Sequence, residues 1–320
     1  MGALLMDSFN HKKILITGGA GFLGSHIIEN LLNHRHVSPD QIIIPRSVSC
    51  DLRVWDNCAR VVKDVDVILH LAARVGGIGF NMGYPGDLFF DNIIMGLQLI
   101  EAARRENVRK FVALGTVCAY PKYSPVPFKE EDLWNGYPEE TNAPYGLAKK
   151  MMIVQADAYR RQYGFNCINL LPVNLYGPRD NFNPDSSHVI PAIIKKIYDA
   201  KLRGENQVEI WGTGRASREF LYVEDAAEGI LLATERYNKP DPVNLGAGFE
   251  ITIKNLVELV AGLMKFDGEI IWDKTKPDGQ PRRCLDVSKA EKEFGFKATT
   301  DFTEGLSRTI AWYVKQRQSA

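Results

Sequence analysis

The sequence shows no excess of charge of either sign and no long apolar run. Its 320 residues include 39 lysines and arginines and 39 aspartates and glutamates, so the formal net charge at pH 7 is zero. A neutral chain has no overall electrostatic attraction to nucleic acid or to anionic membranes. No apolar stretch approaches the roughly 20 residues of a membrane-spanning helix, and residues 1–11 lack the basic start and apolar core of a secretory signal. We therefore expect a cytoplasmic protein that has no nucleic-acid or membrane partner.

Cysteine is also scarce, and its spacing argues against two kinds of site. The five cysteines are an odd number, and no two of them are close enough in sequence to form a Cys-x-x-Cys metal-binding pair. Neither a disulfide framework nor a structural zinc site is therefore expected. The sequence favours reduced thiols and no bound metal. The residues are Cys50, Cys58, Cys118, Cys167 and Cys284.

Short apolar runs alternate with helical patterns through the first half of the chain. Short strands that alternate with amphipathic helices are typical of a parallel sheet that is covered by helices on both faces. The pattern predicts an α/β fold of the Rossmann type, with a doubly wound parallel sheet. The predicted strands are residues 13–17, 41–44, 65–71, 110–115 and 167–171, and the predicted helices are residues 25–33, 91–107 and 144–163.

The alternation loosens after about Pro178, where a smaller α/β domain is expected. No internal repeat or low-complexity linker separates the two parts. We expect residues 1–177 to form a dinucleotide-binding Rossmann domain, to which a later segment of about 208–235 returns, and residues 178–320 to form a ligand-binding domain. The predicted elements of this half are a polar loop at 181–187, helices at 189–202, 224–237 and 253–266, and strands at 208–211 and 242–245.

Three glycines form a turn between the first predicted strand and the first predicted helix. Gly18, Gly21 and Gly24 recur at every third position. Glycine permits a tight turn and lets backbone N–H groups approach a pyrophosphate, which then rests on the helix N-terminus. The alternative is a turn that needs glycine only for positive φ. The strand before the glycines and the helix after them favour the dinucleotide site.

The end of the second predicted strand indicates which nicotinamide cofactor binds. NAD-binding enzymes usually place an aspartate or glutamate near this point to hold the ribose hydroxyls. Here Ile44 is followed by Pro45-Arg46-Ser47, which supplies a cation and a hydroxyl but no acid. These residues suit the 2′-phosphate of NADP(H), although Arg46 would also suit an ordinary solvated surface. Asp51 lies just beyond, where it would either hold the adenine or cap a helix.

A tyrosine and a lysine lie one turn apart on the predicted helix 144–163. Tyr145 and Lys149 share one face of that helix, and a lysine cation near a phenol favours the phenolate. Such a pair can exchange a proton with an alcohol or sugar oxygen near neutral pH. Thr116, at the end of a predicted strand, is a third candidate. Together with the glycine turn, these residues indicate hydride chemistry at a carbonyl or alcohol, the alternative being an ordinary solvated helix face.

Several motifs together resemble the extended short-chain dehydrogenase/reductase family, which acts on nucleotide sugars. More narrowly, the chain is similar to the GDP-sugar 3,5-epimerase/4-reductases of that family, from Lys13 to about Trp312. The resemblance implies an NADPH-dependent enzyme that epimerises and reduces GDP-4-keto-6-deoxy-D-mannose, a second domain that binds the nucleotide sugar, and a homodimer. The motifs are Thr17-Gly-Gly-Ala-Gly-Phe-Leu-Gly24, Leu71-Ala-Ala73, Arg74-Val-Gly-Gly-Ile-Gly79, Cys118-Ala-Tyr-Pro-Lys122, Glu139-Glu-Thr-Asn-Ala-Pro-Tyr145, Tyr145-x-x-x-Lys149, Pro172-Val-Asn-Leu-Tyr-Gly-Pro178, Asn181-Phe-Asn-Pro-Asp-Ser-Ser-His-Val-Ile-Pro191 and Arg218-Glu-Phe-Leu-Tyr-Val-Glu-Asp225.

The resemblance also implies catalytic roles. The 4-keto group acidifies the hydrogens at C3 and C5, so epimerisation needs a base on one face of the sugar and an acid on the other. By resemblance Cys118 is the base and His188 is the acid, although each alone would also suit a packing or loop residue. Tyr145 would protonate the C4 oxygen, Lys149 would hold the nicotinamide ribose, and Thr116 would bond to the same oxygen as Tyr145. Where the family commonly has serine, Thr116 keeps a hydroxyl.

The implied ligand contacts come from both halves of the chain. Lys196 and Arg218 would approach the diphosphate. Arg282 and Arg283 would close over the ligand, unless these two arginines are ordinary solvated residues. Trp211 would pack beside the sugar or base, or else belong to the core, and Asn174 would contact the sugar or its phosphates. The cofactor contacts would be Gly18, Gly21, Phe22, Leu23, Gly24, Arg46, Asp51, Leu71, Ala72, Ala73, Tyr145, Lys149, Pro172, Asn174, Leu175 and His188.

Three other activities fit much of the same sequence. Enzymes for related GDP-6-deoxy-sugars, such as a colitose-type synthase, share nearly all of these motifs. A nucleotide-sugar epimerase would reuse bound NAD without net reduction, but the missing acid after Ile44 argues against it. A dinucleotide sensor on the same fold would not need Tyr145 and Lys149. Residues 91–107 and 148–163 are expected to pair in the homodimer, although their apolar stripes also suit packing within one chain.

Overall fold

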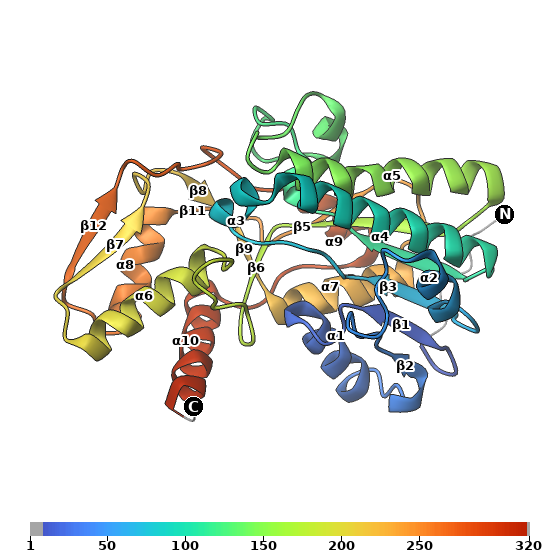
Figure 1. Ribbon diagram of the computed structural model, residues 1–320, viewed down its shortest axis with the longest axis horizontal. Helices are drawn as coiled ribbons and strands as arrows, with labels where there is room; N and C mark the ends of the chain where they lie inside the picture. Colours follow the sequence, from blue (N-terminus) through green and yellow to red (C-terminus); the bar gives the residue numbers. More distant parts are fainter. Residues whose placement is uncertain (1–8, 319–320) are drawn as a thin grey trace.

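The structure is a computed structural model that describes residues 9–318. Residues 1–8 and 319–320 lie outside the described residues, and with them most of the N-terminal segment for which no secretory signal is expected. The chain forms a larger lobe around a six-stranded sheet and a smaller lobe that leads to the C-terminal helix (Figure 1). Among residues 9–318, no helix is both long enough and apolar enough to cross a bilayer.

The larger lobe is built on a parallel sheet with the strand order β10-β5-β4-β3-β1-β2. The strands are β1 (Ile14–Thr17), β2 (Ile42–Ile43), β3 (Val67–His70), β4 (Lys110–Leu114), β5 (Cys167–Pro172) and β10 (Val243–Leu245). In β1, Ile14 and Ile16 belong to one apolar cluster, whereas Leu15 belongs to another. Alternate side chains of the strand therefore pack on opposite faces, as expected for a parallel sheet that is covered on both sides.

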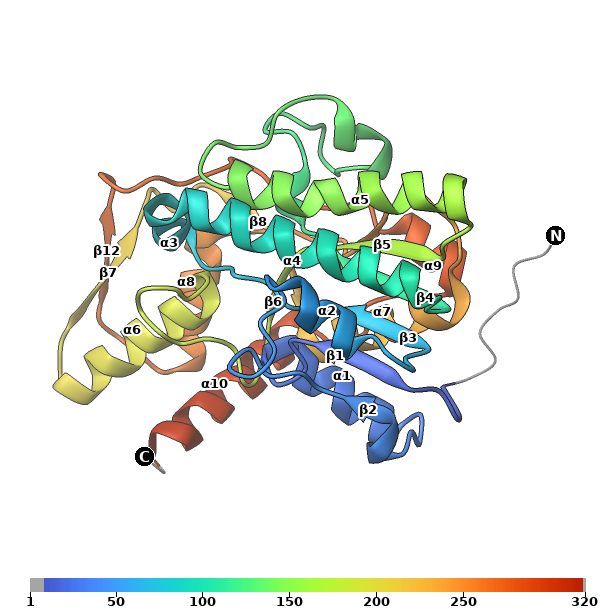
Figure 2. The same cartoon turned by 45° about the vertical axis from the view of Figure 1, so that its right-hand side comes forward.

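Helices cover both faces of this sheet. They are α1 (Phe22–Asn33), α2 (Trp55–Val61), α4 (Pro85–Arg105), α5 (Ala143–Tyr163), α7 (Val223–Arg236) and α9 (Ser288–Phe294), and the short helix α3 (Ile78–Gly83) packs against α4. On one face α1 packs along α7, and α9 packs against α7. On the other face α4 and α5 run side by side, with α2 against α4 (Figure 2). These layers confirm the predicted doubly wound α/β fold.

The smaller lobe has its own apolar cluster. Its main elements are α6 (Val189–Arg203), β7 (Gln207–Trp211), α8 (Ile253–Leu263), β12 (Glu269–Asp273) and α10 (Phe302–Gln318). β7 and β12 pair in parallel, and Ile194, Val260 and Leu306 bring three helices into one core. This lobe is thus an α/β unit whose elements come from separate parts of the chain.

Two short strand pairs and three 3-10 turns complete the elements that position the site. The strands are β6 (Asn174–Tyr176), β8 (Ser217–Arg218), β9 (Phe220–Tyr222) and β11 (Ile251–Thr252), and the turns are η1 (Pro39–Gln41), η2 (Val117–Ala119) and η3 (Glu130–Trp134). β6 pairs in parallel with β9, and β8 pairs antiparallel with β11. The first pair aligns Asn174 with Phe220, the first residue of β9. Because Phe220 is two residues after Arg218, the pairing joins two segments that carry predicted ligand contacts.

Most of the predicted segments are present, with several changes of extent. The strand predicted at 41–44 shrinks to two residues because Pro39–Gln41 forms a 3-10 turn that Ser38 caps. The helix predicted from residue 91 begins at Pro85, since proline suits the first turn of a helix. Of the segment 208–235 that is expected to return to the larger lobe, α7 packs against α1, whereas β7 pairs with β12 in the smaller lobe.

Candidate active site

A cavity of about 1420 Å³ is lined by residues from both lobes. It lies at the carboxyl ends of β1, β3, β4 and β5, where ligands bind in doubly wound folds. All residues that the sequence marks for cofactor, catalysis or substrate line this one cavity. They are Gly18, Gly21, Phe22, Leu23, Gly24, Arg46, Asp51, Leu71, Ala72, Ala73, Thr116, Cys118, Tyr145, Lys149, Pro172, Asn174, Leu175, His188, Lys196, Trp211, Arg218 and Arg283.

The glycine turn leaves no room for side chains at two of its positions. Gly18 has a φ of +74°, in the left-handed region, and a Cβ at Gly24 would lie 2.3 Å from the carbonyl oxygen of Gly18. Gly21 stands at the N-cap of α1 and brings no side chain to cap the helix. The first N–H groups of α1 therefore point into the cavity. Because the positive end of the helix dipole lies at the same place, this turn suits a pyrophosphate.

Residues after β2 and β3 complete the fit to a dinucleotide. Arg46 is exposed and lines the cavity, so its guanidinium is available to a 2′-phosphate. Asp51 is held by Arg53 at 2.8 Å, which lowers the pKa of the carboxyl. The N-cap of α2 is Val54, so Asp51 does not take the N-cap position considered for it. After β3, the backbone N–H of Ala72 donates to Thr17 Oγ1 at 3.3 Å. These residues fit NADP(H).

Tyr145 and Lys149 are both buried at the start of α5. Burial is the main influence on the pKa of Tyr145 and raises it, Cys118 adds to the rise, and a hydrogen bond with Thr116 opposes it. This direction differs from the expectation that Lys149 favours the phenolate. The reason is desolvation, which also lowers the pKa of Lys149 to about 8. In this structure Tyr145 is therefore a protonated phenol beside Thr116, a state that suits a proton donor.

Cys118 lies in η2, directly after the end of β4. Its backbone N–H donates to Thr116 Oγ1 at 3.1 Å, which fixes the turn. Arg283 Nη1 donates to Cys118 Sγ at 3.6 Å, and Sγ lies 3.9 Å from Asn142 Oδ1. Cys118 is half-buried, whereas the other four cysteines are buried. A guanidinium beside the sulfur can stabilise negative charge that develops there.

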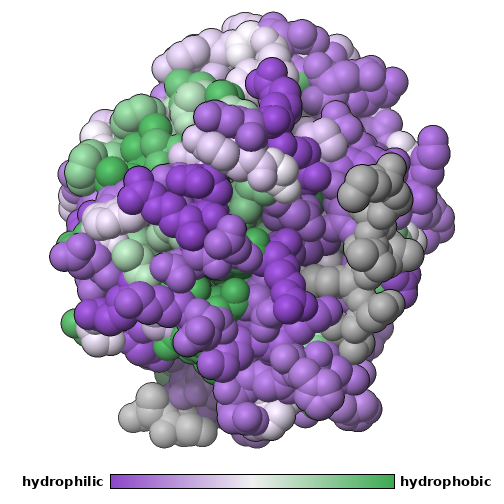
Figure 3. All heavy atoms as spheres, turned by 90° about the vertical axis from the view of Figure 1, so that its right-hand side faces the viewer, coloured by the Kyte–Doolittle hydropathy of each residue, from purple (hydrophilic) through white to green (hydrophobic). Residues whose placement is uncertain are grey.

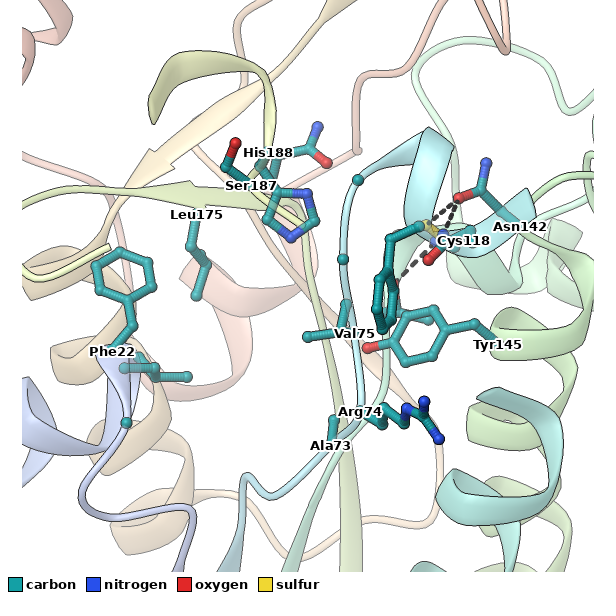
Figure 4. Close-up of a pocket in the computed structure, with 18 of the residues that line it drawn as sticks. Phe22, Ala73, Arg74, Val75, Cys118, Asn142, Tyr145, Leu175, Ser187 and His188 are labelled. Carbon is teal, nitrogen blue, oxygen red and sulfur yellow. Dashed lines mark hydrogen bonds between the residues drawn. The ribbon is translucent and has the colours of Figure 1, made fainter. Parts of the chain in front are cut away.

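His188 enters the cavity from the smaller lobe. It occupies the N-cap position of α6, and burial, followed by the charge of Arg283, lowers the pKa of its imidazole. Figure 4 shows His188 and Ser187 on one side of the cavity, with Cys118, Asn142 and Tyr145 on the other. The cavity thus has one proton-transfer group on each side, which is the arrangement that inversion of a carbon centre requires.

Cations gather at the end of the cavity that the smaller lobe forms. Arg218 is buried and donates to the carbonyl oxygens of Ser217, Asp278 and Gln280, which hold the guanidinium without neutralising it. Lys196 Nζ donates to Glu209 O at 2.8 Å and lies 5.8 Å from the Trp211 ring centroid. These groups form a site for a polyanion that has a flat group nearby.

The structure decides between the alternatives considered for Trp211 and for Arg283. Trp211 is 47% exposed and lines the cavity, so it is not a core tryptophan. Arg283 is buried beside the cavity, whereas its neighbour Arg282 turns outward to Glu250. The structure therefore separates two adjacent arginines that the sequence treats alike.

The cavity also contains polar residues to which the sequence analysis assigns no individual role. Their positions depend on contacts between distant segments, such as the hydrogen bond from Asn81 Nδ2 to Asn142 Oδ1 at 3.0 Å. The only local signal was the Asn-Ala-Pro start of the helix that carries Tyr145. The residues are Asn81, Asn142, Ser187, Asp278 and Gln280.

Comparison with known proteins finds similar chains over nearly the whole length. The model of the NAD dependent epimerase/dehydratase family matches residues 14–246. The probable GDP-L-fucose synthase 1 of Oryza sativa subsp. japonica is 39% identical over 311 residues, covering 96% of this chain and 94% of that protein. The GDP-L-colitose synthase of Yersinia pseudotuberculosis is 34% identical, covering 96% of this chain and 99% of that protein. A GDP-L-fucose synthetase structure from Naegleria fowleri bound to NADP has a TM-score of 0.83 at 26% identity, covering 100% of this chain and 98% of that one.

Proposed function

The chain belongs to the NAD dependent epimerase/dehydratase family, and within it we propose an NADPH-dependent 3,5-epimerase and 4-reductase that converts GDP-4-keto-6-deoxy-D-mannose to GDP-L-fucose. The observation that carries the proposal is the placement of Cys118 and His188 on opposite sides of one cavity that also contains Tyr145. A simple reductase needs only the tyrosine, whereas an epimerase/reductase needs all three. The name of the rice relative supports the same substrate.

The cofactor is proposed to be NADPH, held by the glycine turn and by Arg46. Gly18 and Gly24 leave room for a pyrophosphate to approach the backbone at the start of α1, and Arg46, on the cavity wall, would bind the 2′-phosphate. NADPH supplies the hydride when it is bound. Lys149 would hold the nicotinamide ribose. The other residues named above as cofactor contacts line the same cavity.

Cys118 and His188 are proposed to carry the epimerisation. Cys118 takes the proton from C3 or C5 on one face of the keto sugar, and His188 returns a proton on the other face. Burial and Arg283 lower the pKa of His188, which makes its imidazolium the stronger acid. Thr116 and Tyr145 donate to the C4 oxygen while negative charge resides on it. No net proton is gained or lost by the sugar in this step.

Tyr145 is proposed to complete the reduction at C4. Its pKa is raised by burial, so the phenol keeps its proton until the C4 oxygen becomes an alkoxide. Proton transfer from Tyr145 to that oxygen then gives the alcohol. Thr116, which is hydrogen-bonded to Tyr145, holds the oxygen in line with the phenol.

The smaller lobe is proposed to hold the GDP part of the substrate. Arg218 and Lys196 bind the diphosphate, because both are cations that their own contacts leave unneutralised. Arg283 and Asn174 contact the sugar side, and Trp211 stacks on a flat or apolar part of the ligand. We accordingly propose that residues 1–177 bind the cofactor, together with later segments that return, and that residues 178–320 bind the nucleotide sugar.

A homodimer in the cytoplasm is proposed as the working form. α4 and α5 carry exposed apolar side chains, among them Phe90 at 59%, Val154 at 48% and Tyr163 at 49%. The surface that Figure 3 displays is mostly hydrophilic, with its largest hydrophobic area toward the upper left and smaller ones near the centre. Two copies that pair through α4 and α5 would cover these side chains with four helices. Light scattering of the purified protein measures the mass directly.

The experiment that tests the function is NADPH oxidation in the presence of GDP-4-keto-6-deoxy-D-mannose, with the product identified by NMR. The proposal predicts NADPH loss and GDP-L-fucose. No activity on this sugar, with GDP-L-colitose formed from a related GDP-keto-sugar, would favour the colitose-type alternative that the name of the Yersinia relative represents. Epimerisation of a nucleotide sugar without NADPH loss would instead assign the chain to the epimerases that reuse NAD.

A further inference from the structure

Three buried polar side chains form a hydrogen-bonded cluster beside Cys118. Two of them come from the segment before α5, and the third comes from α3. Asn142 Oδ1 lies 3.9 Å from Cys118 Sγ and accepts from Asn81 Nδ2 at 3.0 Å. Asn142 Nδ2 donates to Glu139 Oε2 at 2.5 Å. Asn142, Asn81 and Glu139 are 7%, 4% and 7% exposed, so water competes little for these bonds. The sulfur therefore faces Asn142, whose position in the cavity wall is fixed by hydrogen bonds (Figure 4).

Asn142 occupies a helix N-cap without using its side chain as a cap. Asparagine is favoured at N-caps because its side-chain oxygen can accept from the first turn of the helix. Here the side chain makes no capping hydrogen bond to α5. Its oxygen faces Cys118 and Asn81 instead. The helix therefore lacks a stabilising cap, and the reactive sulfur has a hydrogen-bond acceptor beside it.

Glu139 determines which end of the Asn142 amide faces the sulfur. A carboxylate accepts hydrogen bonds and donates none, so the amide nitrogen of Asn142 must face Glu139. Glu139 is itself fixed, because Oε1 accepts from Thr141 N at 3.2 Å and Oε2 accepts from Thr141 Oγ1 at 2.7 Å. The amide oxygen is thereby held toward Cys118, where it can accept a hydrogen bond from the thiol but can give none to a thiolate.

Cys118 Sγ thus lies between an acceptor and a donor. The acceptor is Asn142 Oδ1, and the donor is Arg283 Nη1 at 3.6 Å. Arg218 and Tyr145 also interact electrostatically with Cys118, and His188 lies across the cavity. Arg283 favours negative charge on the sulfur, whereas the Asn142 oxygen favours the protonated sulfur. A group that must take a proton and later release it needs both.

We propose that Asn142 is a positioning residue for Cys118: its amide oxygen orients the sulfur and stabilises the thiol that forms when Cys118 takes the sugar proton, and Glu139 fixes that orientation. The role in epimerisation rests on the proposed function. The effect on the sulfur does not, because it follows from contacts within this chain.

The test compares the wild type with Asn142→Ala, Glu139→Gln and Glu140→Gln. Glu140 is the matched control, because it is the adjacent glutamate but is exposed and pairs with Lys122. The pH dependence of Cys118 alkylation by iodoacetamide is followed by peptide mass spectrometry, which needs no substrate. Deuterium uptake at C3 and C5 of GDP-4-keto-6-deoxy-D-mannose in D₂O, without NADPH, is measured separately. Thermal melting and NADPH binding report on the fold of each variant.

Asn142→Ala removes the acceptor, so half-maximal alkylation is expected about 0.5 to 1 pH unit lower than in the wild type. Glu139→Gln is expected to shift at least as far. In this variant the N–H of Thr141 holds the oxygen of the introduced glutamine where Oε1 of Glu139 lies, so the glutamine nitrogen faces Asn142. The amide of Asn142 then turns over to accept from that nitrogen, and the N–H groups of Asn142 face the sulfur. Deuterium uptake is expected to fall about tenfold or more in both variants. Glu140→Gln leaves both measurements unchanged.

Unshifted alkylation in Glu139→Gln and Asn142→Ala would overturn the proposal, whatever happens to activity. If Asn142→Ala fails to fold, Glu139→Gln decides, since it is isosteric. Equal shifts in Glu139→Gln and Glu140→Gln would also overturn it, because a general loss of negative charge would then explain both. Shifted alkylation with no deuterium uptake by the wild type would keep the positioning role but reject the proposed function.

Discussion

Replacing Arg46 by alanine is expected to remove the preference for NADPH over NADH. The segment after β2 carries Arg46 and Ser47 on the cavity wall, and the carboxylate of Asp51, five residues after Arg46, is already held by Arg53. The cation therefore has the 2′-phosphate as its natural partner, and NADH offers no group at that position. The effect of the substitution should be specific to the phosphorylated cofactor.

The size of the effect follows from the exposure of Arg46. A hydrogen bond to a charged group contributes about 1.5 to 3 kcal/mol, which corresponds to roughly 10- to 150-fold in affinity. Arg46 is exposed, so solvent screening places the loss toward the lower end of that range. We expect kcat/KM for NADPH to fall by about 10- to 50-fold, with NADH changed by less than about threefold. For the same reason, added salt should weaken the preference of the wild type.

The assay is a comparison of kcat/KM for both cofactors in the wild type, Arg46→Ala and Arg60→Ala. Arg60 is the matched control, because it donates to Asn57 Oδ1 and Ser49 O in the same region but is not among the residues that line the cavity. Equal losses with NADPH and NADH would refute the reasoning, and so would an unchanged preference in Arg46→Ala. Loss of the preference in Arg60→Ala would show that charge near the site, rather than contact, sets it.

Four further predictions concern the chemistry, the substrate and the fold. Tyr145→Phe should slow NADPH oxidation by about 10²- to 10⁴-fold while deuterium uptake at C3 and C5 falls much less, because Thr116 remains as a donor to the C4 oxygen, and equal loss of both would contradict separate roles. Cys118→Ala should lose deuterium uptake at C3 and C5 but keep NADPH binding, measured by calorimetry. Arg218→Met should weaken GDP binding by about 10- to 100-fold without changing NADPH binding, both measured by calorimetry. Lys110 is 1% exposed and its pKa is lowered by burial to about 7 from 10.5, so between these pH values the unfolded state binds more protons and stability rises with pH by up to about 1.4 kcal/mol per unit. In urea unfolding from pH 7 to 9.5, the difference between wild type and Lys110→Met should show this slope, and a flat difference would contradict it.

Local patterns in the sequence were enough to locate the cofactor half of the site. Residues 14–16 and 67–69 are continuous apolar runs within two buried strands, and the glycines after the first strand fix where a pyrophosphate must lie. The carboxyl ends of parallel strands meet at one edge, so Gly18 and Thr116 had to face a common space. The pairing of β10 with β5, in contrast, joins segments more than 70 residues apart and leaves no local signal.

The features that the sequence did not reveal depend on tertiary contacts. The pKa of Tyr145 rises because the phenol is desolvated, and a helical spacing of four residues says nothing of burial. Arg282 and Arg283 look alike in sequence, but only Arg283 reaches Cys118. Asn142 was recognisable as part of a helix start, yet its contact with the sulfur depends on how η2 packs against α5.

One cavity is proposed to perform two epimerisations and one reduction, and the full reaction with NADPH in D₂O, followed by NMR of the product, tests all three. We expect one NADPH consumed per sugar, deuterium at both C3 and C5, and protium at C4, because the solvent supplies the first two hydrogens and the cofactor supplies the third. A product with protium at C3 or C5, or deuterium at C4, would contradict the proposal.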